Sequence, residues 1–249
     1  MNVIIPLIKR DWLEFRKHVL SILFFWILMP ILIHVFLAIP LSRLITLDVR
    51  YLNWSSAGVW ITTSCMAAFL VTSIHLRKIH LGSQQIEAIL QSPVTNMELL
   101  SVIILKGVIF GFCQFVCAIF ITSTLNHEYF SIGQIAIIIS QMLVIIFSFS
   151  AFGTLIGLII SSGMAFIQFS FTIFLFTSVG MGIFIPMSYY PDGYISIMER
   201  IPFTIVFGNI QAAIINDSIH WLGLFLTIGI TGIIIIISLI LSHKIFRST

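Results

Sequence analysis

Residues 77–98, RKIHLGSQQIEAILQSPVTNME, form the one sizeable segment between two apolar runs that combines charge, amide side chains and helical spacing. Ile86, Ile89 and Leu90 fall at positions i, i+3 and i+4, so a helix here would place them on one face. Polar side chains would then occupy the remaining faces. The pattern predicts a short amphipathic helix.

Pro93 stops this predicted helix, because proline lacks the amide hydrogen that would continue it. Thr95, followed three residues later by Glu98, is a capping box that begins the next helix. Residues 79–92 are therefore expected to form a discrete helix between two membrane helices. Two interpretations stay open: a coupling element that a soluble partner pushes, and an interfacial connector that covers lipid headgroups.

The composition indicates an integral membrane protein. Hydrophobic residues make up 59% of the chain and charged residues 8%, whereas soluble domains carry about 25% charged residues. The mean hydropathy is +1.14. We therefore expect an all-α membrane fold in a single transmembrane domain over residues 1–249.

Uninterrupted uncharged runs give the number of membrane crossings, since a spanning helix needs roughly 20 apolar residues. Five runs are long enough, and the run from 129 to 191 has room for two helices separated by the small residues at 161–163. The sequence thus predicts six spans. The run from 201 to 216 is too short to cross, and the segment 188–217 is expected to be extracellular with a re-entrant part.

The basic residues predict the orientation. With the N-terminus inside, nine of them are cytoplasmic and three are outside, as the positive-inside rule requires. Both termini are then cytoplasmic. The net charge of +3 follows from this bias, so it does not point to a nucleic-acid partner. The loop-poor, isoleucine-rich chain is typical of a bacterial cytoplasmic membrane protein.

Residues 1–18 carry apolar side chains at alternating steps of three and four, Trp12 among them, with charged residues such as Arg16 on the other faces. This spacing predicts an amphipathic helix at the cytoplasmic surface. It is either a membrane anchor or, because both signs of charge are present, a second docking surface for a soluble partner.

The predicted spans contain few candidates for a substrate path. His34 is the only strongly ionisable side chain near the middle of any predicted span. It is either a neutral partner in an interhelical hydrogen bond or a proton carrier. The fifth span is rich in phenylalanine and carries Gln168. We assign His34, Gln168 and Phe171 to a possible substrate path.

Small residues within the spans predict packing. The pairs Gly107/Gly111 and Gly153/Gly157 have GxxxG spacing, and we expect each to pack within the chain. The three cysteines lie in predicted spans without the spacing of a disulfide framework, and they are expected to pack as small apolar side chains. The sequence predicts no metal site.

The sequence lacks the motifs or charged residues that several classes of protein require. The chain has no GxxxxGK[ST] motif, so it is not itself a P-loop ATPase. No aspartate or glutamate falls inside a predicted span, which disfavours proton- or sodium-driven carriers. It has no HExxH motif and no nucleophile elbow, so nothing indicates an intramembrane enzyme.

Two motifs, one at residues 87–100 and one ending at residues 201–204, resemble those of the permease subunits of type-2 ABC (ATP-binding cassette) exporters. The residues Glu87-Ala-Ile-Leu-Gln-Ser-Pro-Val-Thr95, followed by Glu98-Leu-Leu, are similar to that family's E-x-L-L-x-x-P-V-[ST] motif after span two. The stretch from Tyr190-Pro191 to Ile201-Pro-Phe-Thr204 is similar to the family's outside segment, which ends in N-P-L-T before the last span. The amphipathic N-terminus and the six spans agree with the family as well.

The resemblance implies a permease that moves a hydrophobic or amphipathic substrate, such as a peptide, an antibiotic or a lipid-like molecule, out of the cell. It would pair with itself or a related chain and bind two copies of a separate ATPase, which would hold the ATP and Mg²⁺; this chain needs no cofactor. The resemblance places the following residues at the ATPase contact: Gln84, Gln85, Glu87, Ala88, Gln91, Trp12 and Arg16.

The chain departs from the family at two places. Many members have Gly-Thr where this chain has Gln84-Gln85, and a glutamate and an arginine where it has Gly208 and Gln211. The second departure removes a charge pair and favours a more apolar exit. The alternatives are a polysaccharide or glycolipid exporter, an ATPase-independent channel or carrier, and a non-transporting membrane partner.

Overall fold

The computed structural model describes residues 16–47, 49–82, 95–127, 129–215 and 221–247. Within these residues the chain is helical and has no strand. Six helices are long and apolar enough to cross a membrane, which confirms the predicted all-α membrane fold: Val19–Leu41, Tyr51–Ile79, Asn96–Asn126, Ile132–Ile159, Gly163–Gly180 and Trp221–Ile245.

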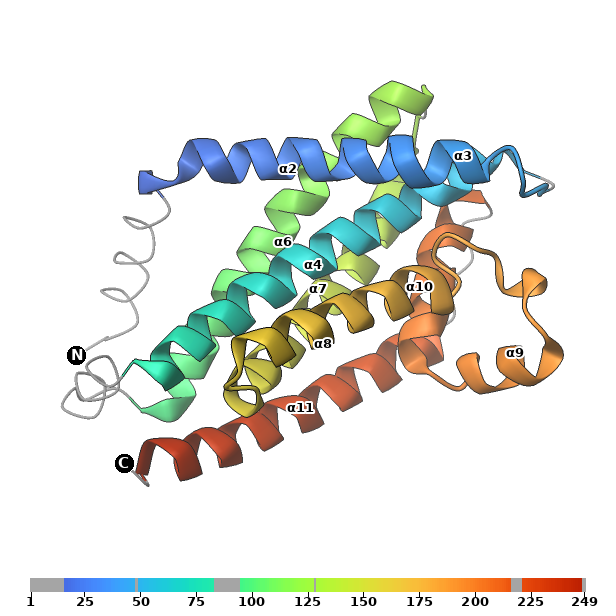
Figure 1. The fold of residues 1–249 in the computed structure, drawn as a ribbon. Coiled ribbons are helices and arrows are strands. Elements are labelled where there is room, and N and C mark those ends of the chain that lie inside the picture. The colour runs from blue at the N-terminus through green and yellow to red at the C-terminus, as the bar shows by residue number, and fades with distance from the viewer. Residues whose placement is uncertain (1–15, 48, 83–94, 128, 216–220, 248–249) are drawn as a thin grey trace.

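The described helices form an antiparallel bundle around one central helix (Figure 1). Helix α2 crosses one side of the bundle, and helices α8 and α11 lie on another. The elements are, in order, α2 (Val19–Ile33), η1 (His34–Ala38), α3 (Ile39–Leu41), α4 (Tyr51–Leu81), α6 (Asn96–Asn126), α7 (Ile132–Ile159), α8 (Gly163–Leu175), η2 (Phe176–Gly180), η3 (Met187–Tyr189), α9 (Asp192–Met198), α10 (Pro202–Ile215) and α11 (Trp221–Arg247).

Helix α4 is the centre of the bundle although its hydropathy, 1.6, is lower than that of four of the other five spans. Its most apolar window is 78% buried, whereas the windows of the first, fifth and sixth spans are 22% buried. The reason is its many small and hydroxyl side chains, since these let neighbouring helices approach closely. Those that are buried include Ser55, Ser56, Ala57, Thr63, Ser64, Ala68, Thr72 and Ser73.

Both GxxxG pairs pack against this central helix, which confirms within-chain packing. A Cβ atom added to Gly111 would lie 3.0 Å from the Ser64 carbonyl oxygen, and one on Gly153 would lie 2.6 Å from that of Phe69. Gly107 and Gly157 are similarly close to α4. The glycines of α6 and those of α7 therefore pack closely against two sides of α4.

The described start of α2, the end of α4, the start of α6 and the end of α11 share one end of the bundle, here called the α4–α6 end (Figure 1). The predicted capping box is confirmed there: the Glu98 amide donates to Thr95 Oγ1 at 3.2 Å, and the Thr95 amide donates to Glu98 Oε2 at 2.9 Å. The opposite end, which carries α9, is called the α9 end.

The prediction that a separate helix begins at residue 79 is wrong. Residues 79–81 are the last turn of α4, and the Gly82 amide caps that helix by donating to the Lys78 carbonyl at 3.0 Å. The helix continues past the basic residues because Leu76 and Ile79 are buried against α6 and α7. Residues 83–92 lie outside the described residues.

The predicted turn at 161–163 is confirmed, since α7 ends at Ile159 and α8 begins at Gly163. The predicted extracellular segment begins at 188, which leaves the fifth span the residues up to Met187, but its helix ends earlier, at Gly180. Gly182 has a φ of 76°, which a continuing helix excludes. The described part of the expected segment 188–217 is largely helical and contains α9 and the short apolar α10.

Candidate functional site

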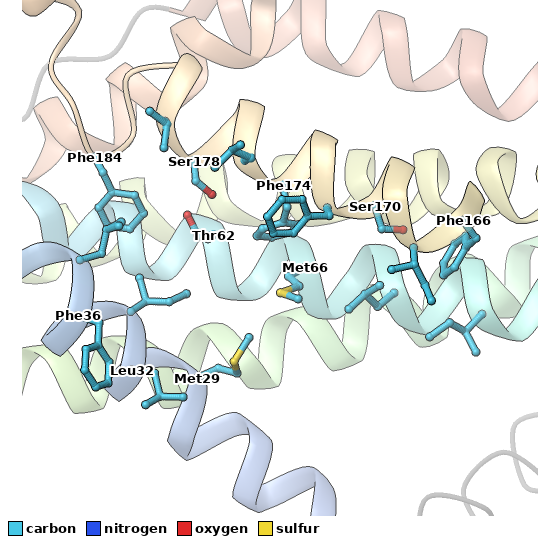
Figure 2. A pocket seen from close by; sticks show the side chains of 18 residues that line it. Met29, Leu32, Phe36, Thr62, Met66, Phe166, Ser170, Phe174, Ser178 and Phe184 are labelled. Atoms are coloured by element: carbon cyan, nitrogen blue, oxygen red, sulfur yellow. The ribbon is translucent and has the colours of Figure 1, made fainter. Parts of the chain in front are cut away.

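An uncharged groove of about 820 Å³ runs between α2, α4 and α8. Ligand pockets typically have volumes of about 300 to 1,000 Å³. Met29, Leu32 and Phe36 line one wall, as Figure 2 shows, and Phe166 and Phe174 project from α8 on the other. None of the described side chains that line this groove is ionisable.

Three hydroxyl groups interrupt the apolar lining. Thr62 lies on α4, Ser170 on α8 and Ser178 on η2. The oxygens of Thr62 and Ser178 face each other across the groove (Figure 2). Thr62 and Ser170 are buried, and neither hydroxyl oxygen has a hydrogen-bond partner within the described chain.

Arg77 fixes α8 at the α4–α6 end of the groove. From the last turns of α4, its Nε and Nη2 atoms donate to the Ser161 carbonyl at 3.3 Å and 3.0 Å. Its guanidinium lies 5.5 Å from the ring centroid of Phe166, within cation–π range. A Cβ on Gly163 would lie 3.2 Å from Arg77 Nη2, so glycine leaves room for this approach.

Tyrosine hydroxyls hold the other end of the same helix. Tyr190 donates to the Val179 carbonyl and Tyr194 to the Gly180 carbonyl, each at 2.8 Å. These bonds satisfy carbonyls that the ending helix leaves without a partner. Burial raises the pKa of Tyr190, so its phenol stays protonated and able to donate.

Phe184 closes the groove at the α9 end. Its carbonyl accepts a 2.6 Å hydrogen bond from the Tyr51 hydroxyl at the start of α4. The neighbouring non-helical backbone is held by Gln211 of α10, whose Nε2 donates to the carbonyls of Gly182 at 3.2 Å and Ile183 at 3.0 Å. A neutral amide therefore stabilises this corner.

The structure brings one of the three predicted path residues to the groove. Phe171 lines it and is 68% exposed. Gln168 is exposed and is not among the lining residues. His34 is buried in η1 and hydrogen-bonds to the Asn126 side chain of α6, while its Nδ1 has no partner among the described residues. His34 therefore lies between helices and outside the groove.

Most of the predicted ATPase contacts fall outside the described residues. These are Trp12, Gln84, Gln85, Glu87, Ala88 and Gln91. Arg16 is described and is exposed in a helical turn just before α2.

Sequence reasoning missed Ser170 and the role of Arg77. A signal for Ser170 was present, because Phe166, Ser170, Phe174 and Ser178 recur every four residues and so share one helix face. No pattern distinguished Arg77 from the other basic residues at the ends of spans. Its partners Ser161 and Phe166 are more than eighty residues away in sequence, and only folding brings them together.

The cysteines are free: Cys65 is buried in the core, and Cys113 and Cys117 are half-buried on α6. The part of the chain that the structure describes holds no cluster of three metal-ligating side chains. No family model matches the chain, and no curated protein sequence does either.

Proposed function

We propose that this chain is the permease subunit of an ATP-driven ABC exporter that moves a hydrophobic or amphipathic substrate out of the cell. A separate cytoplasmic ATPase, in two copies, would hydrolyse ATP, and a second permease chain would complete the pathway. The setting would be the cytoplasmic membrane of a bacterium, with both termini inside.

The observation that carries this proposal is the position of the groove relative to α4. Helix α8 forms one wall of an uncharged, ligand-sized groove, and helix α4 forms its floor. Helix α4 leads directly into the stretch that resembles a coupling helix, and Arg77 links its last turns to α8. A push on residues after Leu81 would therefore reach the groove wall through a continuous helix.

The groove also accounts for the type of substrate. A hydrocarbon-rich cargo gains from burial against methionine, leucine and phenylalanine side chains. A strongly charged cargo, such as an acidic glycan, would find no ionic partner among the described lining residues. This favours a peptide, antibiotic or lipid-like cargo over a charged polysaccharide.

The test is co-purification from the native membrane under gentle solubilisation. The wild type should bring down a soluble P-loop ATPase and show ATP hydrolysis, and Glu87→Arg should lose the ATPase or uncouple its hydrolysis. Glu199→Arg is the matched control: Glu199 is exposed and directly follows α9, so the substitution should leave the complex intact. A wild-type protein that purifies without ATPase or ATP turnover, and conducts solute alone in liposomes, would instead be a channel or carrier.

A further inference from the structure

Two groove hydroxyls lack the hydrogen bond that serine and threonine usually make inside a helix. Such a hydroxyl normally donates to a carbonyl of its own helix three or four residues earlier. Thr63 does so with Val59 at 2.8 Å, next to Thr62 on α4. Thr62 and Ser170 are 5% and 9% exposed, and their oxygens have no partner among the described residues.

An unpaired buried hydroxyl is unfavourable, so each of these groups would gain from a partner that enters the groove. Ser170 and Ser178 are eight residues apart on one face, which corresponds to roughly 12 Å along a helix. Thr62 faces Ser178 (Figure 2). The groove therefore presents hydroxyls at two levels, with Met66 and Phe174 between them.

The charge of the occupant follows from the same lining. An ion placed here would lose its water and meet no ionisable side chain among the described lining residues. A neutral hydroxyl, ester or amide group would lose less and would recover one hydrogen bond at each level. The polar groups of the ligand should therefore be uncharged.

The route of entry favours a lipid. The rims of the groove are apolar side chains that face outward, with Phe36, Ile167 and Phe171 all more than 60% exposed. These side chains belong to helices long enough to span a bilayer, so their exposed faces would meet hydrocarbon. A molecule dissolved in the membrane could enter sideways without crossing a polar surface.

We propose that the groove binds an uncharged lipid-like amphiphile that has neutral hydrogen-bonding groups separated by a hydrocarbon segment. Thr62 and Ser170 bind those groups, and Met66, Leu70 and Phe174 cover the chain. Its identity as the exported cargo rests on the proposed function, but the binding itself requires no ATPase.

Methyl ricinoleate tests this proposal, because it carries an ester and a hydroxyl on one chain and has no charge. Methyl oleate lacks the hydroxyl, and ricinoleate at pH 9 carries a carboxylate. Binding to the full-length wild type would be measured by native mass spectrometry at a fixed ratio of ligand to detergent. We expect methyl ricinoleate to bind about threefold to tenfold more tightly than either comparator, the range of one net hydrogen bond.

The double variant Thr62→Val, Ser170→Ala should abolish the preference for methyl ricinoleate over methyl oleate. Thr63→Val is the control, since it removes a hydroxyl that bonds within its own helix, and it should preserve the preference. A preference that survives in the double variant, or ricinoleate binding as tightly as its methyl ester, would overturn the proposal. Tighter binding of an uncharged hydrophobic tripeptide would overturn the assignment to a lipid.

Failure here and failure of the exporter proposal are distinguishable. The binding assay reports on the groove alone, whereas co-purification of the ATPase reports on the connection after α4. A protein that brings down its ATPase but binds no neutral lipid would remain an exporter with a different cargo.

Discussion

The guanidinium of Arg77 lies over the ring of Phe166 at 5.5 Å and joins the last turns of α4 to the first turns of α8. Phe166 and Ser170 are the buried side chains of α8, so the helix has little other anchorage in the core. The neighbouring Lys78 is exposed, whereas Arg77 is only half-exposed. One side chain thus connects the α4–α6 end to the wall of the groove.

Replacing Arg77 should loosen α8 without unfolding the bundle. Arg77→Gln removes a cation–π contact and charged hydrogen bonds, which at a half-exposed site are together worth about 1 to 2 kcal/mol. Amide hydrogen exchange at residues 166–170 should then become roughly tenfold faster. Lys78→Gln changes the charge equally and should leave this exchange unchanged; equal effects of the two variants would mean that Arg77 acts only through its charge.

Close packing of the glycines makes the bundle sensitive to a single added methyl group. Gly153→Ala would place a Cβ 2.6 Å from the Phe69 carbonyl oxygen, a contact that only a shift of α4 or α7 can relieve. We expect a loss of about 1 to 3 kcal/mol in the free energy of unfolding, measured by thermal denaturation in detergent.

Gly232→Ala provides the control, because nothing lies within 4 Å of the added methyl group on α11. Alanine is the better helix former, so the Tm should stay constant or rise. A drop in Tm equal to that of Gly153→Ala would contradict the packing described for α4.

The capping box fixes where α6 begins. Thr95→Ala removes the oxygen that accepts from the Glu98 amide, and it should cost the first turn about 1 kcal/mol. Faster amide exchange at residues 97–99 is the expected observation. Thr95→Ser keeps an accepting oxygen and should restore wild-type exchange; if it fails to do so, the threonine methyl group and not the cap stabilises this turn.

Gln211 should be essential for the corner that closes the α9 end. Gln211→Leu is similar in size but leaves the carbonyls of Gly182 and Ile183 without their donor, at an expected cost of about 1 to 3 kcal/mol. Thermal denaturation measures this loss. Gly208→Ala on the same helix meets nothing within 4 Å and should be tolerated; if it proved as damaging, α10 itself and not the amide would be the sensitive feature.

The ends of the membrane helices were predicted correctly from the sequence where a strong local motif, such as a cap or a turn, marks them. The capping box at Thr95 and the small residues at 161–163 placed two helix starts correctly, because caps and turns depend on neighbours in the chain. The end of α4 was misplaced, since burial of Leu76 and Ile79 against α6 and α7 extends the helix beyond its basic residues. The end of the fifth span was also misplaced; there the hydroxyls of Tyr190 and Tyr194, in the segment that follows, bind the last carbonyls of the helix.

The sequence by itself determined the class of this protein, the six apolar helices and the glycine pairs that pack them, because hydropathy and small-residue spacing act locally along the chain. Only the tertiary structure decided that the least apolar of the first four spans lies at the centre, that His34 is outside the groove, and that Thr62 and Ser170 share it. Those outcomes depend on which faces of separate helices meet. Helix-face pairing is set by the fit of side chains distant in sequence, so no local pattern in the chain contains it.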